Sequence, residues 1–354
     1  MLKIQRLSKT FGTARAVDGA TFDVAQGELV CLLGPSGCGK STLLRMIAGL
    51  ADSDDGQVMI DGQDMTRLAA NRRPTAMVFQ SHALWNHMNV AQNVAFGLRV
   101  RGLPRREIAA KVTTALDLVG LAGFGKRKPA DLSGGQAQRV ALARCLVVAP
   151  KVLLMDEPFS ALDAHLRKNL REELKALQHR LGLTIIFVTH DQEEAMELAD
   201  RIAVMNVGRI EQIGAPDRLY LEPRTLTVAR FIGTMNEGEA LIAKGRADWY
   251  GAEVTTRCPD GPAVILCRPE DFDVSATGIE TTVARVIDLG SVLRVNAVTA
   301  KGAALVWLCP RSLAPTVGSR VCLTPRHLHV YRDGQRLGTA APIPLALERK
   351  RSPA

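Results

Sequence analysis

The chain has 354 residues, of which 47% are hydrophobic and 23% charged, so it can form a sizeable core and its length suits two domains. Its formal net charge of +9 permits nucleic acid or anionic lipid as a partner, but an aromatic content of 4% disfavours single-strand binding, which uses stacking platforms. No apolar run approaches the roughly 20 residues that span a bilayer, so if the protein works at a membrane, another chain supplies the spanning part. The 7 cysteines are widely spaced, which predicts reduced thiols in a cytosolic protein.

The chain begins with a predicted strand over residues 2–7 and a turn over residues 9–12 that contains Phe11. A ring at this point either stacks on a nucleotide base or packs in the core, and its position alone favours neither.

A glycine-rich loop follows a predicted buried strand at residues 27–33 and precedes a predicted helix at residues 41–48. Strand, loop and helix in this order are the context that identifies a P-loop. Its backbone N–H groups are expected to surround the phosphates of a nucleoside triphosphate, with the helix dipole behind them, Lys40 facing the outer phosphates and the Ser41 hydroxyl binding Mg²⁺. The predicted phosphate-binding residues are Gly34, Pro35, Ser36, Gly37, Cys38, Gly39, Lys40, Ser41 and Thr42.

Three further predicted strands end at polar residues. They are residues 76–79, followed by Gln80; residues 152–155, followed by Asp156 and Glu157; and residues 184–188, with His190 just past their end. Asp156 can order the ligands of Mg²⁺, and Glu157 can orient and deprotonate water. Gln80 can reach the metal or the water, or be an ordinary loop residue. Ligands bind at the carboxyl ends of parallel strands, so His190 is expected to contact the terminal phosphate.

A second glycine-rich turn, Ser133-Gly134-Gly135-Gln136, precedes a predicted helix over residues 137–149. This turn can hold only the outer face of a phosphate that is bound elsewhere. One chain with two half-sites predicts two chains that share two nucleotides. Residues from about 81 to 145 are predicted to form an inserted helical subdomain, because they show helical spacing interrupted by glycine and proline.

Residues 2–236 resemble the ATP-binding subunit of an ABC importer, an α/β P-loop NTPase. The matching motifs are Phe11 as the adenine-stacking aromatic, the P-loop, Gln80 as the Q-loop, Leu132–Gln136 as the signature, residues 152–158 as the Walker B strand, residues 160–163 as the D-loop and His190 as the switch histidine.

The resemblance implies ATP and Mg²⁺ as cofactors, with Glu157 as the catalytic base beside His190. It implies that Ser41, Gln80 and Asp156 bind the metal. In a head-to-tail homodimer, each ATP would lie between the P-loop of one chain and the signature turn of the other, with Ser133, Gly134, Gly135, Gln136 and Asp163 contributing to nucleotide binding. Transmembrane permease subunits, and indirectly a solute-binding receptor, would be partners at the cytoplasmic face of the inner membrane.

Residues 237–335 are predicted to form a small all-β domain with strands at residues 282–286, 292–298, 304–307 and 320–323. With Arg268-Pro269-Glu270, this region resembles the oligonucleotide-fold-like (TOBE-type) domain found after importer ATPases. The strands carry valine and alanine where a nucleic-acid binder would show aromatics, so we expect no nucleic acid and an accessory or regulatory role. Residues 336–354 are predicted to be a disordered tail.

Two functions are compatible with these motifs. One is the ATP-hydrolysing motor of an import complex; the other is an ABC ATPase acting on nucleic acid or ribosomes, which usually has two cassettes or a long coiled-coil insertion. A single P-loop and a single signature favour the importer. For cargo, residues 97–121 and 205–214 resemble the polyamine branch, which grades into ferric-iron, phosphonate and sugar importers.

Overall fold

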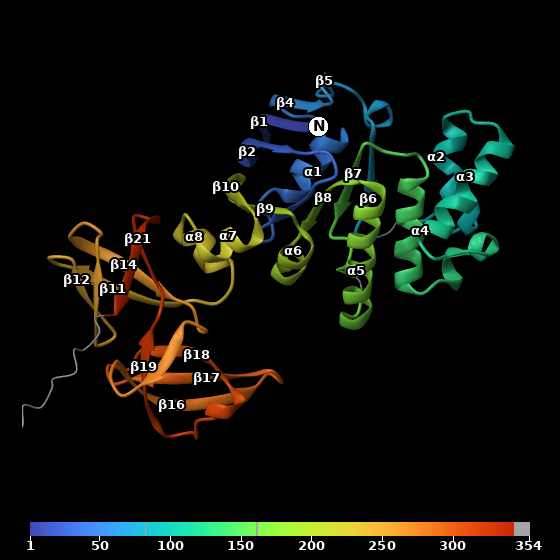
Figure 1. Cartoon of the computed structure of the whole chain (residues 1–354). Helices are drawn as coiled ribbons and strands as arrows, with labels where there is room; N and C mark the ends of the chain where they lie inside the picture. The colour runs from blue at the N-terminus through green and yellow to red at the C-terminus, as the bar shows by residue number, and fades with distance from the viewer. Residues whose placement is uncertain (82, 161, 343–354) are drawn as a thin grey trace, which may run out of the picture. The chain divides into compact units, whose positions relative to one another are not determined.

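A computed structural model of the chain describes residues 1–81, 83–160 and 162–342, which form two compact units (Figure 1). The first unit is Met1–Leu221, and the second begins at Glu222. The predicted boundary after residue 236 came too late in the chain. The Tyr331 hydroxyl donates to the carbonyl of Pro223 at 2.9 Å, and Leu226 N–H donates to the carbonyl of Gly334 at 2.8 Å, so this segment is bonded to the second unit.

The first unit is built on a six-stranded, mainly parallel sheet in the order β10-β9-β3-β8-β7-β6, in which only β10 is antiparallel. Its central strands are continuous apolar runs, as expected of parallel strands covered on both faces. The strands are β3 (Leu29–Leu33), β6 (Thr75–Val78), β7 (Val152–Asp156), β8 (Thr184–Thr189), β9 (Arg201–Asn206) and β10 (Arg209–Gly214).

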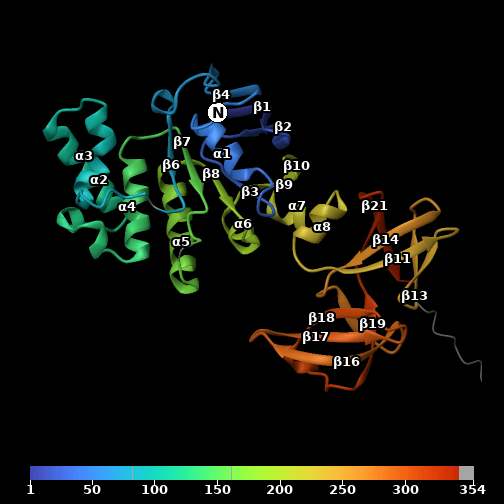
Figure 2. The same ribbon diagram turned by 180° about the vertical axis from the view of Figure 1, so that it is seen from behind.

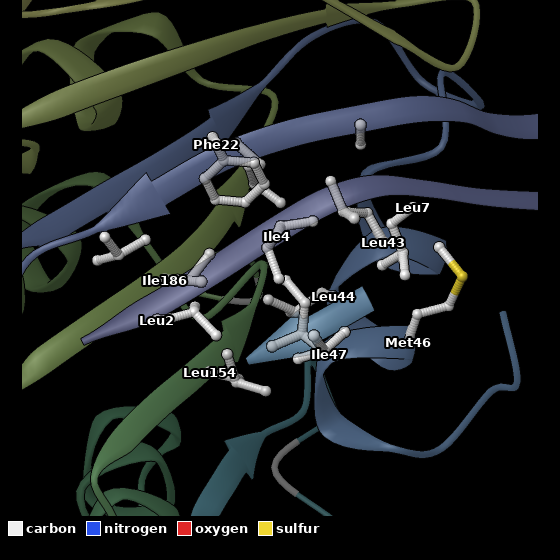
Figure 3. Close-up of a cluster of buried hydrophobic side chains, with 14 of the residues drawn as sticks. Leu2, Ile4, Leu7, Phe22, Leu43, Leu44, Met46, Ile47, Leu154 and Ile186 are labelled. Atoms are coloured by element: carbon white, nitrogen blue, oxygen red, sulfur yellow. The ribbon is translucent and has the colours of Figure 1, made fainter. Parts of the chain in front are cut away.

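Helix α1 (Lys40–Ala48) lies between this sheet and a second, antiparallel sheet of order β2-β1-β4-β5. Leu2 and Ile4 from the antiparallel sheet, Leu44 from α1, and Leu154 and Ile186 from the parallel sheet meet in one buried cluster (Figure 3). The strands of the second sheet are β1 (Leu2–Phe11), β2 (Ala14–Val24), β4 (Asp55–Ile60) and β5 (Gln63–Asp64).

The opposite face of the parallel sheet is covered by α5 (Ala164–Leu181) and α6 (Gln192–Leu198), which lie away from β1 and β4 in both views (Figures 1 and 2). Because successive side chains of a strand point to opposite faces, Met155 packs toward α5 while Leu154 packs toward α1. The unit ends with α7 (Pro216–Leu221).

The predicted helical subdomain consists of α2 (Val90–Val100), α3 (Arg105–Leu118) and α4 (Gly134–Leu146). These helices pack around their own apolar cluster, which includes Val94, Leu116 and Val140. Residue 82, at the start of the predicted subdomain, lies outside the described residues. None of the helices in the described part of the chain is long and apolar enough to cross a bilayer.

The second unit begins with α8 (Leu226–Phe231) and is otherwise a domain of two antiparallel sheets around a shared core. One sheet, of order β11-β14-β20-β21-β13-β12, contains β11 (Asn236–Ile242), β12 (Arg246–Trp249), β13 (Ala252–Thr256), β14 (Gly261–Cys267), β20 (Leu328–Arg332) and β21 (Gln335–Pro342). The other, of order β15-β19-β16-β17-β18, contains β15 (Phe272–Ser275), β16 (Ile279–Asp288), β17 (Val292–Thr299), β18 (Ala304–Pro310) and β19 (Arg320–Pro325). The four predicted strands correspond to β16 to β19.

The prediction of disorder from residue 336 is wrong as far as Pro342. Residues in this segment form β21, which pairs with β20 and β13. Local composition suggested a tail, but the backbone hydrogen bonds of two neighbouring strands supply the order. Residues 343–354, including Arg349-Lys350-Arg351, lie outside the described residues.

His329 on β20 is a buried titratable group in this domain, with only 7% of its surface exposed. Its Nδ1 has no hydrogen-bond partner among the described residues. Burial, together with the charges of Arg336 and Arg268, lowers the pKa of His329 to about 4. The folded domain therefore excludes a proton that the unfolded chain binds below pH 6.5.

We predict that the free energy of unfolding decreases as pH falls from 6.5 toward 4, because only the unfolded state takes up this proton. The slope contributed by one such group is at most about 1.4 kcal/mol per pH unit. Urea unfolding at several pH values, followed by the fluorescence of Trp249 and Trp307, measures it. His329→Gln should flatten this dependence, whereas His327→Gln, at a side chain 75% exposed, should preserve it. Equal pH dependence in wild type and His329→Gln would contradict the assignment.

Candidate functional site

The predicted phosphate-binding, metal-binding and catalytic residues gather at the carboxyl ends of four parallel strands, whereas Phe11, the signature turn and Asp163 lie on other elements. The glycine-rich loop leaves β3, Gln80 follows β6, Asp156 and Glu157 end β7, and His190 follows β8. Because β6, β7, β8 and β3 are neighbours in one parallel sheet, their carboxyl ends share an edge.

The phosphate loop fits closely between two other backbone segments. A Cβ at Gly34 would lie 2.2 Å from the carbonyl oxygen of Met205, and one at Gly39 would lie 2.0 Å from that of Ala16. Gly39 also has a φ of +101°, which side-chain-bearing residues rarely adopt. Glycine is therefore required at both positions for the loop to take this path.

Lys40 is buried beneath the loop and stabilises it. Its Nζ donates to the carbonyls of Gly34 at 2.7 Å and Pro35 at 2.9 Å, and lies 3.7 Å from the Sγ of Cys38. Pro35, Ser36 and Gly37 are exposed at the tip, whereas the Cys38 side chain is buried. The tip of the loop is therefore accessible to a ligand, while the Lys40 ammonium group lies at the base of the loop.

Ser41 and Asp156 meet at the start of α1. The Ser41 hydroxyl donates to Oδ1 of Asp156 at 2.8 Å, although the two residues come from different elements. Asp156 and Gln80 line a cavity of about 490 Å³, and the Ser41 hydroxyl is bonded to Asp156. Carboxylate, amide and hydroxyl oxygens are the donors that Mg²⁺ prefers, so these residues fit the predicted metal.

Arg45 was missed by the sequence analysis. Its Nη2 lies 4.0 Å from Oδ2 of Asp156, and it lines the same cavity. The signal was available, because Arg45 is four residues after Ser41 on a helix and therefore lies on the same face. It adds positive charge where phosphate groups are expected.

Glu157 is held from two sides. Oε2 accepts a hydrogen bond from Nε2 of Gln80 at 3.0 Å, and Oε1 lies 3.3 Å from Nδ1 of His190. Its backbone φ is +46°, in the left-handed region, and its N–H donates to the carbonyl of Val188 at 3.0 Å. Three predicted residues from three strand ends are therefore in direct contact.

Phe11 lies at the end of β1 with 55% of its surface exposed, so it is not a core residue. It pairs across the hairpin with Ala14, on the strand whose Ala16 carbonyl lies against Gly39. Nζ of Lys9 lies 5.5 Å from the ring centroid. An exposed aromatic face near the phosphate loop is suited to stacking on a base.

The signature turn is a well-formed helix N-terminus. Ser133 accepts from Gln136 N–H at 3.4 Å and donates its own N–H to Oε1 of Gln136 at 3.1 Å, so the two form a capping box. A Cβ on Gly135 would lie 2.8 Å from the side chain of Leu166, whereas Gly134 is exposed. Within the described residues, no hydrogen bond or ion pair joins this turn to residues 34–42.

The predicted D-loop contributes Asp163, which caps α5 by accepting from Leu166 N–H at 2.9 Å. Ser160 donates to the carbonyl of Glu157 at 3.0 Å and lines the cavity near Asp156. Residue 161 lies outside the described residues. Asp163 thus has a structural contact in its own chain and is exposed for a further one.

We predict that Gly39→Ala abolishes nucleotide binding, because its methyl group would collide with the Ala16 carbonyl and displace the loop. The matched control is Gly37→Ala, which also has a positive φ but has no atom within 4 Å of its Cβ position. Titration with a fluorescent ATP analogue measures both variants. If Gly39→Ala binds the analogue as tightly as Gly37→Ala, the close approach does not shape the loop.

The chain is similar to known proteins in both of its units. A family model described as "ABC transporter" matches residues 17–160, and one described as "TOBE domain" matches residues 265–331. The chain is 46% identical over 335 residues to a sulfate/thiosulfate import ATP-binding protein of Caulobacter vibrioides, with 93% of this chain and 99% of that protein covered. It is 47% identical over 309 residues to a spermidine/putrescine import ATP-binding protein of Rubrobacter xylanophilus, with 82% of this chain and 81% of that protein covered.

Among solved structures, the ATP-binding cassette MJ0796, in a dimeric post-hydrolysis state bound to ADP and Pi, matches with a TM-score of 0.55 and 30% identity. The match covers 61% of this chain and 99% of that one. The predicted fold, an α/β P-loop ATPase followed by an all-β domain, is confirmed. The chain belongs to the ATP-binding subunits of ABC importers and is an ATPase whose cofactors are ATP and Mg²⁺.

Proposed function

We propose that this protein is the motor subunit of a membrane import complex, in which two copies bind and hydrolyse two ATP molecules between them. The observation that carries the proposal is the separation of two half-sites in one chain. Lys40, Asp156 and Glu157 lie at one sheet edge, while the capped turn at Ser133 has no bond to the phosphate loop in the described residues.

In this proposal the loop backbone and Lys40 bind the β- and γ-phosphates of ATP, and Phe11 stacks on adenine. Ser41, Asp156 and Gln80 hold Mg²⁺, which neutralises phosphate charge when it is bound. Glu157 accepts a proton from the attacking water, and His190, 3.3 Å from that carboxylate, contacts the terminal phosphate. The products are ADP and inorganic phosphate, with the water proton passing first to Glu157.

The second half of each site comes from the partner subunit in a head-to-tail dimer. The capping box satisfies the N–H groups of Ser133 and Gln136, while those of Gly134 and Gly135 have no partner among the described residues. These two N–H groups and the positive dipole of α4 suit the outer face of a γ-phosphate. That end of α4 consists of Ser133, Gly134, Gly135 and Gln136. The exposed Asp163 lies near it, because Asp163 accepts from Leu166 N–H and the Leu166 side chain lies against Gly135. The dimeric state of the related cassette MJ0796 supports the pairing of two copies.

The complex is proposed to contain transmembrane permease subunits that dock on this ATPase at the cytoplasmic face of the inner membrane, and a receptor that delivers the solute. We expect sulfate or thiosulfate as the cargo, because relatives covered over 99% of their length carry that name in Caulobacter vibrioides and Burkholderia mallei. The polyamine prediction has support from the relative in Rubrobacter xylanophilus, which matches over less of its length.

The shared site can be tested by mixing two defective chains. In a Glu157→Gln background, which slows hydrolysis by about 10²- to 10⁴-fold by removing the base, one chain carries Lys40→Ala and the other Ser133→Arg. Each homodimer then has two damaged sites. In a mixed dimer both lesions fall in one site and the other is intact, so we predict one retained ATP per dimer after gel filtration of labelled, differently tagged heterodimers.

If both half-sites belonged to one chain, the lesions would fall in different sites and mixing would rescue nothing. Retention no greater than that of the parents would therefore refute the head-to-tail arrangement.

Cargo can be tested in a strain that lacks this chain. We predict that ³⁵S-sulfate uptake is lost, that uptake of labelled putrescine is unchanged, and that wild type but not the Lys40→Ala chain restores sulfate uptake. The Lys40→Ala control separates the motor role from any effect of the missing protein on its partners. Loss of putrescine uptake with intact sulfate uptake would favour the polyamine alternative instead.

A further inference from the structure

We propose that Arg167 is a positioning residue that holds the His190 loop against the turn following Glu157, so that both face the terminal phosphate together. The inference rests on the proposed roles of Glu157 and His190. Arg167 lies on the first turn of α5, and its side chain is 29% exposed.

The Arg167 guanidinium bonds to both loops at once. Its Nη2 donates to the carbonyl of Leu162 at 3.0 Å, in the turn that follows Glu157. Its Nη1 donates to Oδ2 of Asp191, the residue after His190, at 3.3 Å. A planar guanidinium fork can serve two acceptors in fixed directions, which a lysine ammonium does less well.

The His190 loop needs such support because its own ring provides little. The side chain of His190 is 57% exposed, and its ring nitrogen lies 3.3 Å from Glu157 Oε1. Its position is therefore set mainly by the backbone on either side. On one side, Thr189 accepts from Asp191 N–H at 3.0 Å and donates to the buried Glu194 at 2.6 Å. On the other side, Oδ2 of Asp191 accepts the hydrogen bond from Nη1 of Arg167.

The same loop contact is supported by α6. Oδ1 of Asp191 accepts from Glu193 N–H at 2.8 Å and Glu194 N–H at 3.3 Å, which caps that helix, while Oδ2 is left to Arg167. Nε of Arg167 lies 3.9 Å from Oε1 of Glu194. One carboxylate thus joins the helix that follows His190 to the helix that follows Glu157.

Arg167 also lies next to the residues that contact the signature turn. Leu162, whose carbonyl it bonds, and Leu166, its neighbour, provide the side chains nearest to Gly134 and Gly135. In a head-to-tail dimer the signature turn serves the partner's ATP, whereas His190 serves the ATP on its own phosphate loop. Arg167 therefore connects the residues that pack beside the signature turn with the His190 loop of the same chain.

The test compares Arg167→Met with Arg171→Met in steady-state ATPase assays of the full chain. Arg171 is also largely buried on α5, but its Nε pairs at 3.1 Å with Glu197, near the end of α6 that is away from the His190 loop. We expect Arg167→Met to lower kcat by about 10- to 100-fold with little change in the KM for ATP, because a small misplacement of catalytic groups costs that much. Arg171→Met should lower Tm and leave kcat unchanged.

Arg167→Lys and Asp191→Asn supply the same test if Arg167→Met does not fold. Arg167→Lys should retain part of kcat, and Asp191→Asn should lower kcat while still capping α6, since Asn and Asp are comparable caps. The proposal is overturned if kcat of Arg167→Met is unchanged, if Arg171→Met lowers kcat equally, or if only KM rises. Glu157→Gln is assayed in parallel to separate failure of the Arg167 proposal from failure of the proposed ATPase mechanism. If the mechanism itself is wrong, Glu157→Gln also keeps wild-type kcat.

Discussion

The arrangement of the nucleotide-binding unit depends on how closely the phosphate loop is enclosed by two other backbone segments. The carbonyls of Ala16 on β2 and Met205 on β9 lie where side chains on Gly39 and Gly34 would otherwise be. The loop is also bonded through Gly208 N–H to the carbonyl of Cys38 at 3.1 Å. The antiparallel sheet, the parallel sheet and the loop therefore meet at one point. A ligand that displaces the loop must therefore displace both sheets as well. Otherwise it binds to the loop in its present position.

The polar residues at the strand ends are preorganised in a second way. Glu157 has a left-handed backbone, which costs on the order of 1–3 kcal/mol for a residue with a side chain. The cost is offset by the bond from its N–H to Val188 and by the Ser160 hydroxyl on its carbonyl. This conformation turns the chain sharply out of β7 and directs the carboxylate toward Gln80 and His190. The strained residue is the one proposed to carry the proton transfer.

Much of this site could be predicted from the sequence because its residues follow buried strands or begin helices. Apolar runs identify β3, β7 and β8, and the residue after each run is placed by topology alone. Arg167 could not be found this way, since on α5 it is one charge among many on an amphipathic helix and its acceptors come from two distant loops. Nor could the end of the first unit at Leu221, because it depends on residues far along the chain: the Tyr331 hydroxyl donates to Pro223, and the Gly334 carbonyl accepts from Leu226. The sequence around Glu157 does not indicate the left-handed backbone that this residue adopts.

The position of β21 in its sheet has a consequence for synthesis. In the order β11-β14-β20-β21-β13-β12, the strand made last among those described lies between strands made earlier. Until Gln335–Pro342 leaves the ribosome, β13 and β20 have no partner between them, and each presents an unpaired edge. The nucleotide-binding unit can fold as soon as its own residues emerge, since domains generally fold in order of synthesis. A nascent chain would therefore carry a finished ATPase unit ahead of an open sheet, and this is the stage at which a chaperone would be most useful.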